Sequence, residues 1–437
     1  MFRLVTLGCV ILFTMTTISA QQPVAPANYD EDKVPKFELT DPLKTTDGRT
    51  INSPELWNTV RRPELLKLFA NEMYGHSPLP LDVAIMQTIE SDIRMTIFSQ
   101  PSGIVFDGKG TRHWYRLAFH KGMSPNRDDT EIDVLIYTPN NVTGKVPAFI
   151  GLNFQGNHTV DSDPGIRLAP VWQNRERVPA REEERGAQAS RWCIEKILDR
   201  GYAVVTAYYQ HIEPDFDGGR QFGVRQLIAK LGAPNEDNAI ATWAWGLSMI
   251  REFVSQRYAD RLNIDPDKII VIGHSRLGKA ALWAAAQDEK FAMAISNDSG
   301  CGGAALTRRE FGETVHRINT AFPHWFNGNF KKYNHDVNAL PFDQHELIAL
   351  IAPRPVYIAS AVEDRWADPK GEFLSGLYAD PVYRLLGTDG IAGITEMPEL
   401  NKSVGGTIGY HIREGKHDVT EFDWEQFLNF ADKHFKR

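Results

Sequence analysis

Cysteine is scarce in this sequence, with 3 residues in a chain of 437. Cys9 lies in an apolar stretch at the N-terminus, whereas Cys193 and Cys301 lie far along the chain. Neither of these two stands with histidines at the spacing of a metal site. In an oxidising compartment they could form one disulfide, but we expect two buried thiols. The sequence therefore predicts no metal and no other cofactor.

Blocks of positive charge are also missing. The formal net charge is -8, from 48 Lys and Arg against 56 Asp and Glu, and no segment is rich in basic residues. Nucleic acids and anionic membranes are recognised by such basic segments. We therefore expect neither as a partner.

Long apolar runs are limited to the N-terminus. Residues 1–20 place Arg3 before an apolar run and end on small residues, which is typical of a signal peptide cleaved near Ala20. No other stretch is long enough to span a bilayer. We expect a soluble, monomeric protein that is secreted or periplasmic, with residues 21–36 as a loose leader after cleavage.

Apolar and aromatic residues are plentiful: 42% of the chain is hydrophobic, with 10 Trp and 23 Phe, enough for a sizeable core. Helical periodicity at 54–76 predicts a helix outside a sheet, and alternation around 88–121 predicts antiparallel strands. Strands and helices then alternate. The predicted strands are 131–139, 146–154, 202–209, 268–273, 291–297 and 355–361, and the predicted helices are 189–199, 238–257, 280–286 and 422–436.

This order predicts an α/β fold with a mostly parallel sheet covered on both faces and antiparallel N-terminal strands. No internal repeat divides the chain, so residues 37–437 are predicted to form one catalytic domain. Two irregular segments, near 155–189 and 302–345, are too long for simple connections. Both leave strand ends, where open α/β sheets bind ligands, so we expect them to be functional.

Residues 267–279 run from an apolar strand into Gly-x-Ser-x-x-Gly and then into an alanine-rich helix. This arrangement is typical of a nucleophile elbow, which exposes a serine on a strained turn at the carboxyl edge of a sheet. Gly273 and Gly278 would leave room for the strand and the helix to approach closely. The segment predicts Ser275 as a nucleophile. The alternative is a serine that only caps a buried helix.

A serine nucleophile needs a histidine base. His411 and His417 both precede the last predicted helix, where α/β-hydrolases carry this base. We favour His417, which follows Gly415 in a loop, and we expect His411 to be structural. His274 is expected to point away from Ser275 and to pack under the turn.

The base needs an acid to orient it, and two places offer one. Asp364 follows the predicted strand 355–361, and Asp298 follows the predicted strand 291–297. A carboxylate at either strand end can accept the histidine N–H. Glu363 and Asp368 are less favoured and are expected to lie on the surface or to cap loops.

Two cations stand beside the predicted nucleophile. Arg276 can steady the negative oxygen of a tetrahedral intermediate, and Lys279, one helical turn from Ser275, can donate to sugar hydroxyls. The alternative for both is a salt bridge on a helix surface. Trp366 suits stacking on a sugar face, although tryptophans are more often buried.

The motifs resemble those of one enzyme family. Residues 273–279, Gly-His-Ser-Arg-Leu-Gly-Lys, are similar to the Gly-Cys-Ser-Arg-x-Gly-Lys signature of the glucuronoyl esterases, the fifteenth family of carbohydrate esterases. Residues 298–303, 366–369 and 415–418 resemble the family in the same order. The resemblance extends from about residue 30 to the end of the chain.

The resemblance implies an α/β-hydrolase fold, a three-layer sandwich around the sheet. It also implies roles for particular residues: nucleophile Ser275, base His417, oxyanion donor Arg276, and uronate-binding residues Lys279, Glu313 and Trp366. Two positions depart from the family. His274 replaces the signature cysteine, which removes a disulfide partner found in fungal members. Asp298 replaces a glutamate and is shorter, which favours Asp364 as the acid.

The predicted activity is that of a secreted serine esterase acting through an acyl-enzyme. Its substrates would be esters of glucuronic acid or 4-O-methyl-glucuronic acid, as in the lignin–carbohydrate links of glucuronoxylan. One alternative is an acetyl xylan esterase, which would not need the cations Arg276 and Lys279. The other is a carbohydrate-binding protein that keeps the pocket without turnover.

Overall fold

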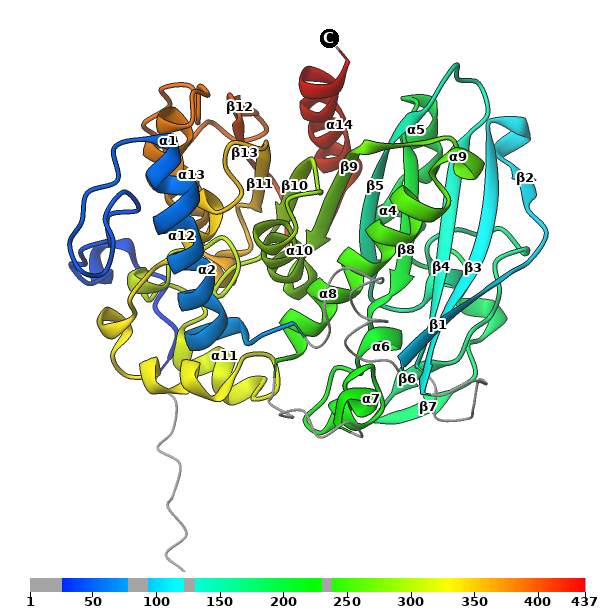
Figure 1. The fold of residues 1–437 in the computed structure, drawn as a ribbon, viewed down its shortest axis with the longest axis horizontal. Coiled ribbons are helices and arrows are strands. Elements are labelled where there is room, and N and C mark those ends of the chain that lie inside the picture. Colours follow the sequence, from blue (N-terminus) through cyan, green and yellow to red (C-terminus); the bar gives the residue numbers. More distant parts are fainter. Residues whose placement is uncertain (1–25, 78–92, 122–129, 230–237, 437) are drawn as a thin grey trace, which may run out of the picture.

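The computed structural model describes residues 26–77, 93–121, 130–229 and 238–436. The predicted signal peptide and the first residues of the predicted leader lie outside these ranges. An 11-stranded sheet runs through the molecule in the order β1-β3-β4-β8-β5-β9-β10-β11-β13-β12, with β2 beside β3 (Figure 1). Its strands are β1 Ile93–Ser99, β2 Gly103–Val105, β3 Gly110–Lys121, β4 Thr130–Pro139, β5 Val146–Asn153, β8 Ala203–Tyr208, β9 Ile264–His274, β10 Met293–Asn297, β11 Val356–Ala361, β12 Val404–Gly405 and β13 Ile408–Arg413.

The sheet has an antiparallel and a parallel part. Strands β1, β3, β4 and β8 pair antiparallel, at the right of Figure 1. Strands β8, β5, β9, β10, β11 and β13 pair parallel. The parallel strands consist almost entirely of buried, largely β-branched or small residues, as expected for strands covered on both faces. The predicted mixed sheet is confirmed.

Helices cover both faces of the sheet and complete three layers (Figure 1). One face packs against α5 and α14, and the other packs against α8, α10 and α13. The helices are α1 Pro54–Leu56, α2 Arg62–Phe69, α4 Ala189–Trp192, α5 Ile194–Asp199, α6 Tyr209–Ile212, α7 Arg225–Ala229, α8 Ala239–Glu252, α9 Ala259–Leu262, α10 Arg276–Gln287, α11 Val315–Ala321, α12 Gln344–Ala349, α13 Pro369–Leu385 and α14 Glu421–Phe435.

The structure departs from the predicted elements in two places. The predicted helix 189–199 is broken at Cys193, whose φ of 44° is left-handed and separates α4 from α5. The long segment near 155–189 carries a two-stranded hairpin, β6 Val171–Gln173 with β7 Glu176–Val178, and the segment near 302–345 carries α11. Cys193 and Cys301 are free thiols, as expected, but only Cys301 is buried, whereas Cys193 is half-buried.

Residues 28–33, within the predicted leader, are docked on the molecule. Glu31 forms ion pairs with Arg309 at 2.7 Å and with Lys370 at 2.8 Å, and the backbone of Gly312 donates to the carbonyl of Asn28 at 2.8 Å. We call residues 28–33 the N-terminal strap. The expectation of a loose leader is therefore wrong for these residues, because their charges and backbone meet partners in the segment 309–312 and at the start of α13.

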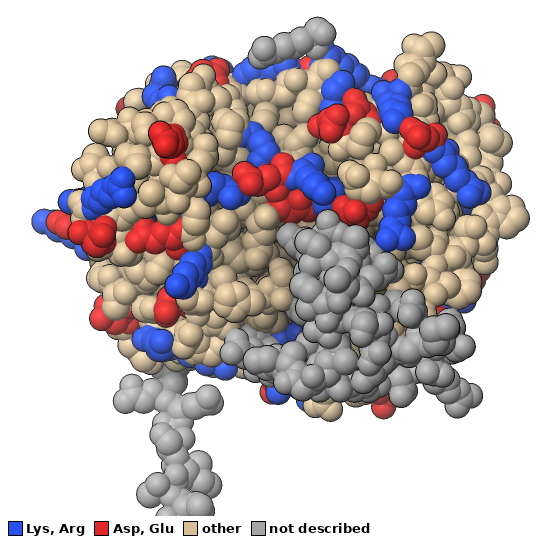
Figure 2. Space-filling model, viewed as in Figure 1, with Lys and Arg blue, Asp and Glu red and all other residues tan. Residues whose placement is uncertain are grey.

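Acidic and basic side chains are interspersed over the face of the molecule in view (Figure 2). This mixture agrees with the absence of basic blocks from the sequence. Within the parts of the chain that the structure describes, none of the helices combines the length and apolarity needed to cross a bilayer.

Candidate active site

Ser275 occupies the turn between β9 and α10. Its φ of 57° and ψ of −129° lie outside the regions that residues with a Cβ ordinarily adopt, so the turn is strained. The turn is fixed because the Ser275 backbone N–H donates to the carbonyl of Asn297 at 2.9 Å. The hydroxyl is thus presented at the carboxyl edge of the sheet, above the N-terminus of α10. This is the geometry predicted for a nucleophile elbow.

The two glycines of the motif allow this turn. A Cβ on Gly273 would lie 2.0 Å from the carbonyl oxygen of Leu277, and a Cβ on Gly278 would lie 2.9 Å from the Cβ of Ser299. Any side chain at position 273 would therefore collide with the backbone of α10. The close approach of strand and helix expected from the sequence is confirmed.

The sheet brings the other candidate residues to Ser275. Strands β9, β10, β11 and β13 are neighbours and parallel, so the segments that follow them meet at one edge. A cavity of about 360 Å³ opens there. All eight candidate residues line it: Ser275, Arg276, Lys279, Asp298, Glu313, Asp364, Trp366 and His417.

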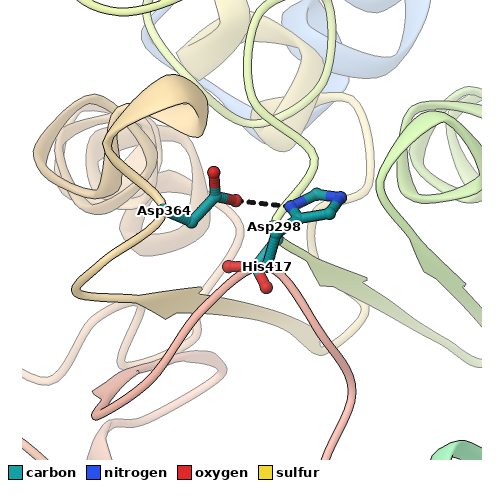
Figure 3. Close-up of side chains that lie close together, drawn as sticks. All are labelled: Asp298, Asp364 and His417. Atoms are coloured by element: carbon teal, nitrogen blue, oxygen red, sulfur yellow. Dashed lines mark hydrogen bonds and ion pairs between the residues drawn. The ribbon is translucent and has the colours of Figure 1, made fainter.

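His417 and Asp364 form a hydrogen-bonded pair in this cavity. The Nδ1 of His417 lies 2.5 Å from the Oδ2 of Asp364 (Figure 3). The Asp364 side chain is 5% exposed and the His417 side chain is 41% exposed. Because a carboxylate only accepts, Nδ1 carries the proton and Nε2 keeps a free lone pair. His417 can therefore take a proton from a neighbouring hydroxyl.

Asp298 lies beside this pair without a hydrogen bond to either member (Figure 3). It is 1% exposed, and its nearest cation, Arg413, is 3.6 Å away. Burial raises the pKa of the Asp298 carboxyl well above its usual range, and the charges of Glu372 and Asp364 add to this. Without a hydrogen bond to His417, this carboxyl does not hold the imidazole as Asp364 does.

Asp298, Asp364 and His417 are also the group of described residues whose ligand atoms lie close enough for a metal ion, within 4.8 Å of one another. The short contact between His417 and Asp364 is that of an N–H with a carboxylate. It explains the closeness of two of the three side chains.

The less favoured candidates have other partners. Asp368 binds Arg309 at 2.8 Å and caps α13 through the backbone of Gly371, and Glu363 is exposed and does not line the cavity. His411 is fully buried in β13, between the carboxylate of Asp423 at 2.9 Å and the hydroxyl of Tyr357 at 2.9 Å. These contacts agree with the structural roles expected for all three.

His274 is buried, as expected, and its ring contacts that of His417. The ring centroids of His274 and His417 lie 4.4 Å apart, with planes tilted by 42°. The Nδ1 of His274 is 2.5 Å from the Oδ1 of Asn297. The sequence predicted the burial and missed the contact with His417.

Arg276 is held against one wall of the cavity. Its guanidinium pairs with Asp215 and lies over the ring of Trp325, 4.7 Å from the centroid. Burial opposes the charge of Asp215, but hydrogen bonds from His324 and Trp325 and the charge of Arg276 hold its pKa at about 2. Asp215 thus remains ionised and fixes Arg276 beside Ser275.

Lys279 lies deeper in the same cavity. Its Nζ donates to the carbonyl of Ser299 at 2.5 Å and lies 3.8 Å from Glu313. Burial raises the pKa of Glu313, against the opposing charge of Lys279. Lys279 is 4% exposed, so the alternative of a salt bridge on the helix surface is wrong.

Trp366 forms the rim and is 41% exposed, so it is not a core tryptophan. Its carbonyl accepts from the backbone N–H of Glu313 at 3.0 Å, which ties the two loops that carry these residues. Phe322 also lines the cavity, with its ring centroid 5.4 Å from the Arg276 guanidinium. The sequence did not single out Asp215, Phe322 or Trp325. Their only signal was their place in irregular segments after strand ends.

Comparisons with known proteins identify relatives of this chain. The sequence model of a family described as "Glucuronyl esterase, fungi" matches residues 200–387. A carbohydrate esterase, MZ0003, from an unknown prokaryotic organism is 44% identical over 416 residues, which cover 93% of this chain and 92% of the relative. A 4-O-methyl-glucuronoyl methylesterase of Podospora anserina is 34% identical over 156 residues, 34% of this chain and 32% of that protein.

Solved structures agree over nearly the whole chain. A glucuronoyl esterase from Solibacter usitatus superposes with a TM-score of 0.84 at 43% identity, covering 93% of this chain and all of that one (100%). A structure described as a promiscuous CE15 esterase from a marine bacterial metagenome superposes with a TM-score of 0.82 at 44% identity, covering 94% and 100%. The chain therefore belongs to carbohydrate esterase family 15, the glucuronoyl esterases, and has their α/β-hydrolase fold.

Proposed function

We propose that the protein is a secreted serine esterase that hydrolyses esters of glucuronic acid or its 4-O-methyl ether. Its natural substrates would be the lignin–carbohydrate ester links of glucuronoxylan. One observation carries this proposal: Ser275, the pair His417–Asp364 and the cations Arg276 and Lys279 line a single cavity. Hydrolytic residues and groups that recognise a hydroxylated acid therefore meet at one place.

Acylation begins at Ser275. Its Oγ attacks the carbonyl carbon of the uronate ester while Nε2 of His417 takes the hydroxyl proton. Asp364 holds Nδ1–H and stabilises the imidazolium. When the tetrahedral intermediate collapses, the C–O bond to the alcohol breaks and His417 passes its proton to the leaving oxygen. Water then attacks the acyl carbon and gives a proton to His417. As the second tetrahedral intermediate collapses, the bond from the acyl carbon to Oγ breaks, His417 returns its proton to Oγ, and the acid leaves.

Arg276 stabilises the negative oxygen of each tetrahedral intermediate. Its guanidinium lies at the cavity wall, and its Nε is buried without a hydrogen-bond partner among the described residues. An unpaired buried donor is costly until an acceptor arrives. The oxyanion is the acceptor that fits, because its charge develops only during the reaction.

Lys279, Glu313 and Trp366 recognise the sugar. Lys279 donates to ring hydroxyls, and Glu313, 3.8 Å away, accepts from them. Trp366, half exposed at the rim, offers an apolar face to the C–H groups of a pyranose ring. An acetyl group would offer Lys279 and Glu313 no hydroxyls to bind. This favours a uronate ester over the acetyl xylan ester.

The decisive experiment compares benzyl glucuronate with p-nitrophenyl acetate. We expect kcat/KM to favour the uronate ester, and Lys279→Ala to lower only the uronate value. A preference for the simple acetate would refute the substrate assignment. Absence of turnover with either ester, alongside measurable binding of glucuronate, would instead support the binding protein without catalysis.

A further inference from the structure

His274, a buried residue beside the proposed catalytic pair, has no part in the mechanism above. Among the described residues, the His417 ring has one hydrogen bond, from Nδ1 to Asp364, and its side chain is 41% exposed. One hydrogen bond leaves an imidazole free to tilt about the bond. Its ring is in contact with one other ring among the described residues, that of His274, with centroids 4.4 Å apart.

His274 itself is held firmly. It ends β9, and its partner in the strand register is Asn297, at the end of β10. The Nδ1 of His274 meets the Oδ1 of Asn297 at 2.5 Å, and the ring of Phe154 approaches edge-on with centroids 6.0 Å apart. The His274 ring is therefore fixed by the sheet and by a neighbouring aromatic ring.

The hydrogen-bond network sets which nitrogen of His274 carries the proton. The Nδ2 of Asn297 donates to the carboxylate of Asp423 at 3.4 Å, and that carboxylate also accepts from His411 at 2.9 Å. Because Asp423 only accepts, the amide of Asn297 must turn its oxygen toward His274. His274 must then donate from Nδ1.

The charge state of His274 also matters, because its ring centroid lies 4.4 Å from that of His417. Burial, followed by the charge of His417, lowers the pKa of His274 well below its usual range. The charged groups around the two rings come from four other elements: Arg191 on α4, Asp298 after β10, Asp364 after β11, and Asp423 on α14. A neutral ring can lie against an imidazolium without repelling it, whereas a second cation would oppose proton transfer to His417.

We propose that His274 is a positioning residue: a neutral imidazole, protonated at Nδ1, that backs the face of His417 and keeps its Nε2 aimed at Ser275 and the leaving oxygen. This proposal rests on the esterase function proposed above. It gives a role to the histidine that stands where the family signature has cysteine. His274 acts through His417 and does not touch the substrate.

The test uses two esters of the same acid with different alcohols. An aryl ester, such as the nitrophenyl ester, expels a weakly basic oxygen that needs little help from an acid, whereas benzyl glucuronate needs proton donation from His417. We expect His274→Ala to lower kcat/KM about 100-fold for the benzyl ester and about 10-fold for the nitrophenyl ester. His274→Phe, which restores a neutral ring, should recover most of the kcat/KM lost on each ester, whereas His274→Gln should not.

A matched control is His411→Phe. His411 is a buried histidine that bonds Asp423, the carboxylate that also accepts from Asn297, and it does not touch His417. This variant should therefore leave the ratio of kcat/KM for the two esters unchanged. Equal losses on both esters in His274→Ala, or rescue by glutamine and not by phenylalanine, would overturn the proposal. Those results would mean that His274 acts only through its hydrogen bond to Asn297.

A second measurement does not depend on turnover. Nitrogen NMR of histidine-labelled protein should show His274 neutral, with its proton on Nδ1, between about pH 5 and pH 8. A charged His274, or one protonated on Nε2, would contradict the proposal. If the wild type hydrolysed neither ester, the esterase function would fail, while this spectrum would still decide the state of His274.

Discussion

Two histidine–aspartate pairs lie near the same end of the sheet and invite comparison. His417 and Asp364 are 2.5 Å apart in the cavity, and His411 and Asp423 are 2.9 Å apart in the core. The side chain of His417 is 41% exposed, whereas both members of the second pair are 0% exposed. The distances are similar, and the surroundings differ completely.

The two pairs differ in the second ring nitrogen of the histidine, the one that does not bond the aspartate. The second nitrogen of His411 is taken by the hydroxyl of Tyr357, and Asp423 also accepts from Arg413 at 2.7 Å. Burial lowers the pKa of His411, so its ring is held neutral and fully bonded. His417 keeps Nε2 for a third group. A histidine–aspartate pair is therefore equipped for catalysis only when one nitrogen stays unbonded and accessible.

The largest expected effect separates the two histidines. His417→Ala should lower kcat on benzyl glucuronate about 10⁴-fold with little change in the melting temperature, because the side chain is half exposed. His411→Ala should leave kcat within about threefold and destabilise the fold by about 2–4 kcal/mol, because it opens a cavity and unpairs Asp423. Steady-state kinetics and thermal unfolding measure both. Similar losses of kcat in the two variants would contradict the assignment of His417 as catalytic and His411 as structural.

The acids provide the next comparison. Asp364→Asn should lower kcat about 10³-fold, because an amide stabilises neither the tautomer nor the imidazolium of His417. Asp298→Asn should cost less than about 10-fold, since this carboxyl is not bonded to His417. The same assay checks both variants. A deeper loss in Asp298→Asn would transfer the role of the acid to Asp298.

The oxyanion donor is expected to have a smaller effect. Arg276→Ala should lower kcat about 100-fold through the loss of one donor, with KM nearly constant. Asp215→Asn should lower kcat about 10-fold, because Arg276 loses the carboxylate that holds it and keeps its own charge. A rise in KM without a fall in kcat would show that Arg276 binds the sugar and does not act on the intermediate.

The smallest effect concerns a buried acid that has no histidine partner. Glu372 accepts from Ser360 at 2.6 Å and from the backbone of Gly300 at 3.0 Å, and burial raises its pKa to about 8. Between the ordinary value of 4.5 and about 8, the folded chain keeps a proton that the unfolded chain releases. Stability due to this group is therefore complete below about pH 4.5 and falls as the pH rises.

Glu372→Gln should remove this dependence. We expect the variant to gain on the order of 2 kcal/mol over the wild type at pH 8 and nothing at pH 4. Chemical denaturation at the two pH values measures the difference. An equal change at both would show that Glu372 does not titrate in the folded protein.

The chemical centre could be predicted from the sequence because its signals are local. An apolar strand that runs into Gly-x-Ser-x-x-Gly allows few alternatives, and parallel strands carry whatever follows them to one edge. His417 was preferred to His411 because it was predicted to lie in a loop. Asp364 was preferred to Asp298 because the Asp298 side chain is shorter than the glutamate of the family. The choice of His417 needed only the order of the elements, whereas the choice of Asp364 also used the resemblance to the family, which has a glutamate at position 298.

The walls of the cavity could not be predicted in the same way. Asp215 and Trp325 lie in irregular segments, and their contact with Arg276 depends on where two distant loops fold back. Hydrophobic periodicity in the sequence does not predict contacts between distant loops. The break at Cys193 was missed for a related reason, because the apolar spacing of 189–199 continues through a residue with left-handed backbone.

The N-terminal strap has a practical consequence for anyone producing this enzyme. Glu31 pairs with Arg309, which precedes Glu313 in the same segment, and with Lys370, at the start of α13 just after Trp366. We expect an affinity tag or fusion partner attached immediately before residue 28 to disturb these ion pairs and, through them, the side of the cavity lined by Glu313 and Trp366. A tag with a generous flexible spacer would spare it, so the choice of spacer can alter measured substrate affinity even though the tag lies far from Ser275 in sequence.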